Sequence, residues 1–213
     1  YQYNTDWQDE MIKKNAQMQS HSVSITGGTG NAVYSFGFSY FDQEGMVGGD
    51  IISAGYRRLT ARANTEIVLW KENDMDILKI GENFTYSNSR NKSVADGNIY
   101  WNDLHNALVA LPFMPVYWDK SPDPNKFAPN LDGYEFSLTN PIASMYYGRN
   151  NQWGKGNNIA GNAYAELQPI KNLKIRTALG VNAWWSYSRS YDPKWQLGAQ
   201  AVNTYDNTSM SNS

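Results

Sequence analysis

Apolar and polar residues alternate with a period of two along much of the chain, which is the pattern of β-strands with one apolar face. The clearest stretch is 32–41, where every second residue from Tyr34 to Tyr40 is aromatic and the residues between them are mostly small. Glu82 interrupts the apolar face of a later strand. The strands expected from this alternation lie near residues 21–27, 32–41, 56–70, 76–88, 159–168 and 173–187.

The connections between these strands alternate between short and long. Polar or glycine-rich turns occupy residues 27–31, 71–74 and 169–172, whereas the connections at 42–55 and 89–156 are much longer. Outer-membrane barrels have short turns at one end and long loops at the other. The pattern therefore predicts an all-β fold, an antiparallel transmembrane β-barrel segment whose strands cross an apolar band of about 25 Å.

The strand near 56–70 separates two kinds of side chain. One of its faces carries Leu59 and Ile67 with small residues between them, and the other carries arginine and glutamate. Charged residues on one side fit a water-filled lumen better than the dry core of a sandwich. The last strand repeats this arrangement with two basic residues. The residues expected to face a lumen are Arg58, Arg62, Glu66, Lys174 and Arg176.

The connection at 89–156 is too long for a simple link, and loops of this length are usually functional. It contains an expected helix at 99–111 and then a proline-rich run, whereas the tail at 188–213 is polar and is expected to add no apolar strand. Aromatic side chains on such a loop suit stacking on sugar rings or on peptide side chains. The alternative is that they pack the loop against itself or against a partner protein. The predicted cargo contacts are Trp101, Tyr117, Trp118, Tyr134 and Trp153.

Composition narrows the function classes. The chain has 213 residues, a formal net charge of −2 and no cysteine. The scattered basic residues give no electrostatic case for binding nucleic acid, and the lack of cysteine excludes disulfides and thiolate metal sites. No apolar run approaches the ~18 residues of a membrane helix. The mean hydropathy is −0.62. This value leaves a barrel open, because barrel strands show an apolar residue only at every second position.

Candidate chemistry is sparse. His21 and His105 have no partner at metal-ligand spacing, and no nucleophile–histidine–acid set is apparent. The stretch 119–133 has enough oxygens to suggest calcium, although its spacing does not match an EF-hand. We therefore expect no catalytic residue, no metal ligand and no cofactor, and we do not expect an enzyme.

Four stretches in chain order resemble the SusC/RagA family of TonB-dependent outer-membrane nutrient transporters. They are NTDWQDEM at 4–11, HSVSITGGTGNAVYSFGFSYFDQEGMV at 21–47, YRRLTARANTEI at 56–67 and AELQPIKNLKIRTALG at 165–180. The resemblance covers most of the chain, with the long connection as its variable part. It implies that residues 1–213 are an internal segment of the barrel domain, about six strands of a barrel of about 22, with an external loop that contains a short helix.

The resemblance also implies partners. Family members carry an N-terminal plug and a SusD-like surface lipoprotein over the external mouth, and TonB powers their import of oligosaccharides or peptides. This chain shows no plug, so we expect a middle piece of a longer protein, with TonB acting through the missing N-terminal part. The expected location is the outer membrane of a Gram-negative bacterium, in contact with lipid, with no role for nucleic acid. The cargo is not specified by the sequence.

Two other hypotheses remain open at this stage. A soluble carbohydrate-binding β-sandwich would use the aromatic loop as its platform, and a glycoside hydrolase would use paired loop carboxylates. A barrel turns Phe36, Leu59 and Leu179 outward to lipid, whereas a sandwich buries them. The position of these side chains in the structure therefore separates the two leading hypotheses.

Overall fold

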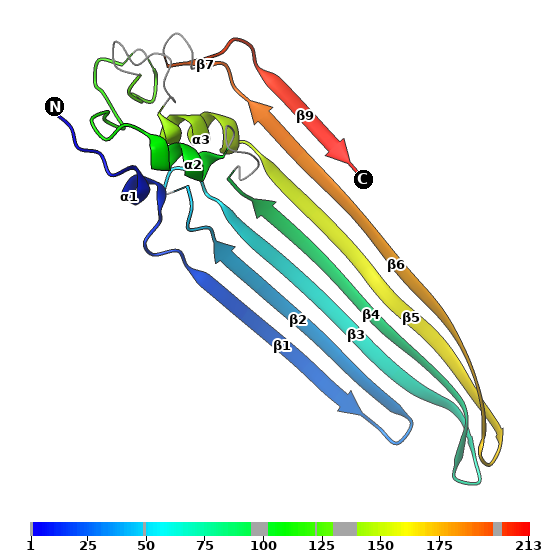
Figure 1. Ribbon diagram of the computed structural model, residues 1–213. Coiled ribbons are helices and arrows are strands. Elements are labelled where there is room, and N and C mark those ends of the chain that lie inside the picture. Colours follow the sequence, from blue (N-terminus) through cyan, green and yellow to red (C-terminus); the bar gives the residue numbers. More distant parts are fainter. Residues whose placement is uncertain (1, 49, 95–101, 122, 130–139, 198–201) are drawn as a thin grey trace.

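The computed structural model describes residues 2–48, 50–94, 102–121, 123–129, 140–197 and 202–213. A seven-stranded antiparallel sheet dominates these residues, and helices and loops gather at one end of it (Figure 1). The strand order is β1-β2-β3-β4-β5-β6-β9, so the first six strands are a meander in which sequence neighbours pair. Short turns therefore lie at one end of the sheet, called the turn end here, and long connections lie at the other, called the loop end.

The strands are longer than their apolar alternation. They span β1 (Met18–Gly28), β2 (Ala32–Glu44), β3 (Gly55–Glu72), β4 (Met75–Lys92), β5 (Trp153–Ile170), β6 (Leu173–Asp192) and β9 (Asn207–Asn212). Each expected strand lies within one of β1 to β6. The added residues lie mostly at the loop end, where backbone pairing continues beyond the point at which the apolar alternation stops.

The tail forms a strand that its sequence does not reveal. β9 pairs with β6 from Asn207 opposite Asp192 to Asn212 opposite Tyr187. Its residues, NTSMSN, are almost all polar, so no alternation marks it. Two further short strands, β7 (Trp195–Gln196) and β8 (Val202–Asn203), pair with each other just before it.

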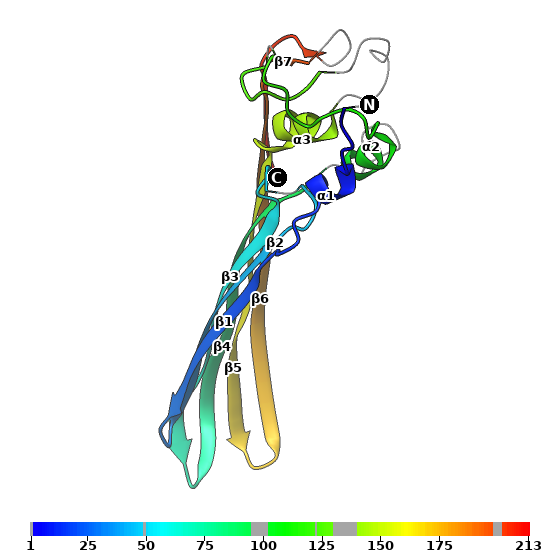
Figure 2. The ribbon, with the colours of Figure 1, turned by 90° about the vertical axis from the view of Figure 1, so that its left-hand side faces the viewer.

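Three short helices lie at the loop end and project to one side of the sheet (Figure 2). They are α1 (Trp7–Met11), α2 (Asp103–Val109) and α3 (Pro141–Arg149). The side chain of Asp6 caps α1 by accepting from the N–H groups of Gln8 and Asp9, and Asn102 caps α2 in the same way. In the described part of the chain, no helix is long and apolar enough to cross a membrane.

The hydrophobic core lies among these helices rather than within the sheet. We call this group the loop cap; it consists of α1, α2 and α3 with residues 110–121, 123–129, 140 and 195–197. Its fully buried side chains include Met11, Met114, Phe127, Ile142, Met145 and Leu197. The described part of the long connection thus packs on itself and against α1 and the tail.

Candidate functional site

The register of the sheet gathers the apolar residues of all six long strands on one face. Phe36 of β2 pairs with Ile25 of β1 and with Ala63 of β3, and the same row continues through Phe84 of β4 to Val181 of β6. Directly paired residues in an antiparallel sheet lie on the same face. We call this the apolar face; its larger members include Val23, Ile25, Phe36, Phe38, Leu59, Ile67, Ile80, Phe84, Ile159, Leu179 and Val181.

Nothing among the described residues covers the middle of the apolar face. Leu179 is 73% exposed, Val23 is 64% exposed and Phe36 is 49% exposed. Soluble monomers rarely leave so large an apolar surface open to water. A β-sandwich would bury these side chains under a second sheet, and the described residues supply no such layer. The structure therefore favours the barrel hypothesis over the sandwich.

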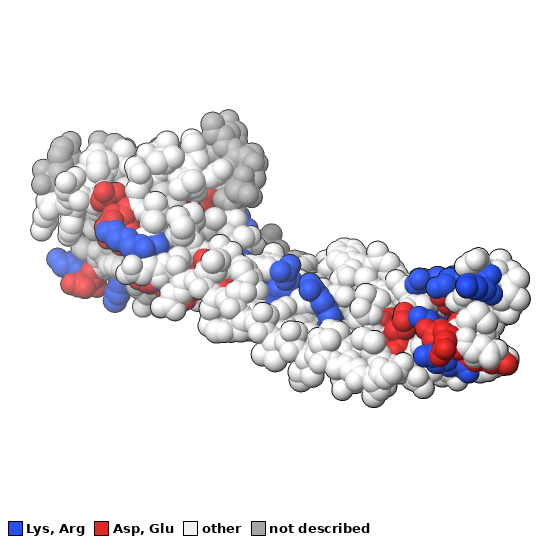
Figure 3. All heavy atoms as spheres, turned by 90° about the horizontal axis from the view of Figure 1, so that it is seen from below, with Lys and Arg blue, Asp and Glu red and all other residues white. Residues whose placement is uncertain are grey.

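Charged and aromatic residues mark the two limits of the apolar face. Lys, Arg, Asp and Glu gather toward the two ends of the molecule, with mostly uncharged surface between them (Figure 3). At the turn end, a register shift in β3 brings Trp70 opposite Leu78 and so onto the apolar face. At the loop end, Trp185 and Tyr187 lie on the same face. Aromatic residues at both limits of an apolar band are typical of outer-membrane barrels.

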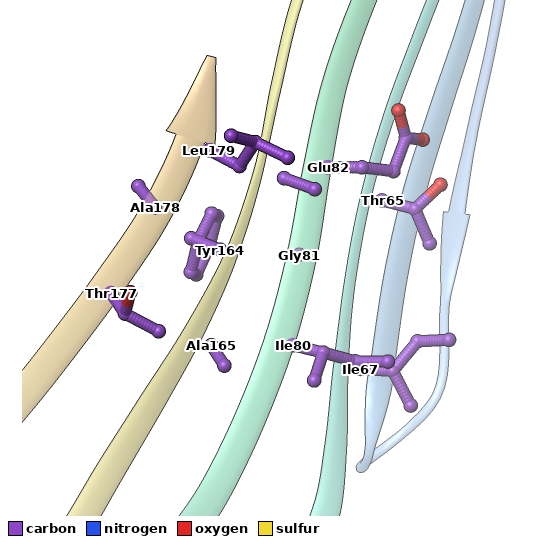
Figure 4. Close-up of a pocket in the computed structure, with 11 residues that line it drawn as sticks. Thr65, Ile67, Ile80, Gly81, Glu82, Tyr164, Ala165, Thr177, Ala178 and Leu179 are labelled. Carbon is purple, nitrogen blue, oxygen red and sulfur yellow. The ribbon is translucent and has the colours of Figure 1, made fainter.

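Small residues leave a hollow of about 540 Å³ on the apolar face. Ile80, Ala165, Thr177 and Leu179 are among the residues that line it (Figure 4). Glu82 lies at its edge and remains on the apolar face, paired with Thr65, as the alternation of the sequence predicts. Most of the residues that line the hollow belong to the apolar face, so we do not count it among the candidate cargo contacts.

The opposite face is polar, and the five residues expected to face a lumen all lie on it. Arg58 pairs with Ser89 of β4, Glu66 pairs with Gly81, and Arg176 of β6 pairs with Glu166 of β5. That this face lines a lumen stays a prediction. The five residues are Arg58, Arg62, Glu66, Lys174 and Arg176.

A network of tyrosine and charged residues lies on the polar face near the turn end. The hydroxyl of Tyr164 donates to Glu66 Oε2 at 2.5 Å, and Lys79 Nζ lies 3.4 Å from Glu66 Oε1. The guanidinium carbon of Arg176 lies 3.6 Å from the centre of the Tyr164 ring. Tyr164 belongs to β5 and reaches Glu66 on β3 by crossing β4 at Gly81, where a Cβ atom would lie 2.4 Å from the ring.

Most charged residues of this network form ion pairs with each other. Lys174 Nζ lies 3.0 Å from Glu166 Oε1, and Lys79 pairs with Glu66 as described above. Exposed ion pairs of this kind contribute little to stability individually. Arg58 and Arg62 differ, because no carboxylate of the described chain lies within ion-pair distance of either one. Of the predicted polar-face residues, these two arginines are therefore the most available to bind an anionic group.

Side-chain hydrogen bonds fix the loop cap. Thr5 Oγ1 donates to the carbonyl of Met114 at 2.6 Å, and Trp7 Nε1 donates to the carbonyl of Leu111 at 2.9 Å. The side chain of Asn140 is fully buried at the start of α3 and bonds both to that helix and to residues 116 and 128. Segments that are distant in sequence thus form one unit above the strands.

Asp123 is the acidic centre of the loop cap. It is 4% exposed, and its Oδ2 accepts from the N–H groups of Asn125 at 2.9 Å and Phe127 at 3.2 Å. Its Oδ1 accepts from the hydroxyl of Tyr147. This carboxylate belongs to the stretch considered for calcium, but it is directed at protein donors. Across the described ranges, no group of three or more acidic, histidine or cysteine residues is placed to hold a metal ion.

Tyr147 gives the loop cap a dependence on alkaline pH. Burial, followed by the hydrogen bond to Asp123, raises the pKa of Tyr147 from its ordinary value of 10 to about 12. Because the folded state holds this proton more tightly than the unfolded state, the stabilisation is complete below about pH 10 and is lost as the pH rises toward about 12. We expect this loss to appear when the unfolding of the loop cap in urea is monitored by hydrogen exchange in the intact protein.

The matched variants for this prediction are Tyr147→Phe and Tyr205→Phe. Tyr147→Phe removes the hydroxyl that serves Asp123, so it should cost about 1–3 kcal/mol at neutral pH and should flatten the alkaline loss. Tyr205 is 69% exposed, so its replacement should change neither quantity. An alkaline loss that persists in Tyr147→Phe would contradict the assignment.

The predicted cargo-contacting aromatics lie in different places. Tyr117 and Trp118 are in the loop cap, 51% and 41% exposed, and the ring of Tyr117 stacks on Phe127 at 5.3 Å between centroids. Trp153 pairs with Arg189 and is the first residue of β5. The long connection therefore ends before Trp153. Trp101 and Tyr134 lie outside the described residues.

One aromatic pair in the loop cap was not anticipated from the sequence. Tyr147 of α3 stacks on Trp195 of β7, with 5.2 Å between ring centres and 7° between planes. A hollow of about 660 Å³ borders this pair and is also lined by Asn125 and Lys194. Trp195 lies in the polar tail, where an isolated tryptophan was the sole signal that could have marked it.

Comparisons with known proteins place the fold. No protein-family model matches the chain. The TonB-dependent receptor P26 of Formosa agariphila is 31% identical over 180 residues, which are 82% of this chain and 15% of that receptor. A structure of the RagAB peptide importer in the closed-closed state has a TM-score of 0.68 and 21% identity, covering 94% of this chain and 21% of that one. A structure of the RagAB peptide transporter has a TM-score of 0.67 and 20% identity, covering 93% of this chain and 21% of that one.

The open antiparallel meander and its uncovered apolar face define a segment of a transmembrane-type β-barrel. The similarity to part of a TonB-dependent receptor and the fold shared with RagAB confirm the resemblance found in the sequence, and the chain has the fold of a barrel segment of such a protein. It spans about a fifth or less of the length of the proteins it matches.

Proposed function

We propose that this chain forms part of the wall of a TonB-dependent importer in the outer membrane of a Gram-negative bacterium. The apolar face meets hydrocarbon and the polar face lines the lumen. The observation that carries the proposal is the single apolar face that runs across six strands without a covering layer. The role is transport rather than catalysis, in keeping with the receptor and importer names of its relatives.

The strand lengths support this orientation. A tilted strand needs about 9–11 residues to cross the hydrocarbon, and β3 to β6 each have at least 18. The excess lies mostly at the loop end, so the strands extend beyond the membrane there and carry the loop cap outside. The short polar turns lie on the periplasmic side.

The cargo is an oligosaccharide or a peptide, taken up at the loop end under a SusD-like surface lipoprotein, and TonB acts on another part of the whole protein. The family resemblance supports these partners, and the RagAB neighbours are named as a peptide importer and a peptide transporter. Within this chain, the exposed rings of Tyr117 and Trp118 offer apolar contact, and Arg58 and Arg62 offer positive charge farther down the lumen. Trp101 and Tyr134 belong to the same proposed set of contacts.

Replacing Trp118 with alanine tests the cargo proposal. Buried aromatic contacts are typical hot spots of binding, so we expect the affinity of the whole transporter for its cargo to fall about tenfold. Isothermal titration with peptide and oligosaccharide pools measures this affinity and also separates the two cargo classes. Trp70→Ala is the control, because Trp70 is 54% exposed but lies at the turn end. Unchanged affinity in Trp118→Ala would remove this residue from the cargo site.

A further inference from the structure

We propose that the apolar face carries, at its loop end, a docking site for the phosphate-bearing headgroups of membrane lipid. The site is centred on Trp153 and formed by Arg90, Lys155 and Arg189. It rests on the proposed orientation of the sheet, in which this face meets the membrane.

Register brings these residues together on one face. Arg57 of β3, Arg90 of β4 and Lys155 of β5 are direct pairing partners in one row across the sheet. In the next row, Trp153 pairs with Arg189 of β6. The guanidinium carbon of Arg90 lies 5.4 Å from the centre of the Trp153 ring, and Lys155 Nζ lies 5.0 Å from it. Two cations thus share one indole, with a third beside it.

The charges of this cluster are not balanced within the described chain. Arg57 is neutralised by Asp42, at 3.2 Å. For Arg90, Lys155 and Arg189, which are all exposed, the described ranges place no carboxylate within ion-pair distance. Like charges directly opposite each other on neighbouring strands repel, so this row favours an anion bound between them. Lys92 is excluded from the cluster because its Nζ donates to Asn150 at 2.7 Å.

The position of the cluster indicates the kind of anion. It lies on the face with Phe36 and Leu179, one row beyond Trp185 and beginning in the row of Tyr187, which pairs directly with Lys155 at the loop end of that face. In the proposed orientation this is the depth of lipid headgroups, and the cluster is on the outside of the barrel, away from the cargo path. Arginine pairs with phosphate through two parallel hydrogen bonds, and tryptophan is favoured at the membrane interface. A lipid phosphate therefore fits the cluster better than a soluble anion.

Removing two of the cations tests the proposal. In the whole transporter held in phosphatidylcholine nanodiscs, Arg90→Gln with Lys155→Gln should weaken the binding of added phosphorylated lipid A. Each charge near an anionic surface contributes about fivefold, so the expected loss is roughly 25-fold. The charge-conserving pair Arg90→Lys with Lys155→Arg should bind like wild type. The control pair Lys71→Gln with Lys171→Gln, two exposed cations at the turn end, should leave binding unchanged.

Two results would overturn the docking site. One is unchanged binding after removal of Arg90 and Lys155, and the other is equal binding of wild type to dephosphorylated lipid A. A spin label at Leu179→Cys, in a chain without native cysteine, reports the orientation separately. If the label contacts lipid while phosphate binding fails, the docking site alone is wrong. If the label contacts water, the proposed orientation and the docking site fail together.

Discussion

Replacing Phe36 with arginine is expected to lower the free energy of unfolding of the barrel by about 2–4 kcal/mol, the cost of a cation on the lipid side of a barrel near the bilayer midplane. Phe36 lies near the middle of β2, paired with Ile25 on one side and Ala63 on the other. An arginine there is paired only with apolar residues, and Glu82, an acidic residue of this face, lies two strands away and one row nearer the turn end. The control below lies on the same strand at nearly the same depth but on the opposite face. A difference between the two variants therefore reports the face on which the residue lies.

That control is Ser35→Arg, one residue earlier on the polar face. Ser35 pairs with Thr26 and Asn64, which suit a cation in contact with water. Its replacement should cost less than about 1 kcal/mol, in the range of ordinary surface substitutions. Urea titration of the whole transporter folded into lipid vesicles gives both values. Equal costs at positions 35 and 36 would contradict the assignment of the two faces.

Replacing Asn140 with alanine is expected to destabilise the loop cap by about 3 kcal/mol. Its Oδ1 accepts from the N–H groups of Ile142 at 3.1 Å and Ala143 at 3.2 Å, and its Nδ2 donates to the carbonyls of Val116 at 2.8 Å and Ala128 at 3.4 Å. Loss of a helix cap costs about 1 kcal/mol, and buried backbone groups left without a partner cost about 1–3 kcal/mol more.

Hydrogen exchange of the intact protein measures this effect locally. The amides of α3 should lose protection, together with those around Val116 and Ala128, while the amides of β1 to β4 keep theirs. Asn102→Ala is the matched control, because Asn102 caps α2 through one hydrogen bond, to the N–H of His105 at 3.0 Å, and is only half-buried. Its cost should stay near 1 kcal/mol. Unchanged protection of α3 in Asn140→Ala would show that Asn140 does not join the segments.

The two faces of the sheet were predictable because a period of two fixes the side of every residue once a strand is recognised. Phe36, Leu59 and Leu179 are brought to one face by the five registers between the six strands, and each register agrees with the alternation in the sequence. The chemistry of the turns then set which end would carry the long connections. The family resemblance pointed to the same fold independently.

The features that the sequence did not predict depend on contacts between distant segments. β9 is a strand because it pairs with β6, and its sequence, NTSMSN, has no apolar alternation that would predict it. Trp153 belongs to a strand because Arg189 pairs with it, although its neighbours in sequence are polar or glycine. The stack of Tyr147 on Trp195 joins a helix to the tail. Such features follow from tertiary packing, which the local pattern does not encode.

The crossing of Tyr164 over Gly81 has a consequence for how the strands align during insertion. A shift of β5 by two residues along β4 keeps every side chain on its own face, so the separation of the apolar face from the polar face does not oppose it. The shift would, however, set the phenol ring against Lys79 or Asn83 in place of a glycine. The bare backbone at position 81 thus selects one alignment among those that hydrophobicity alone would accept.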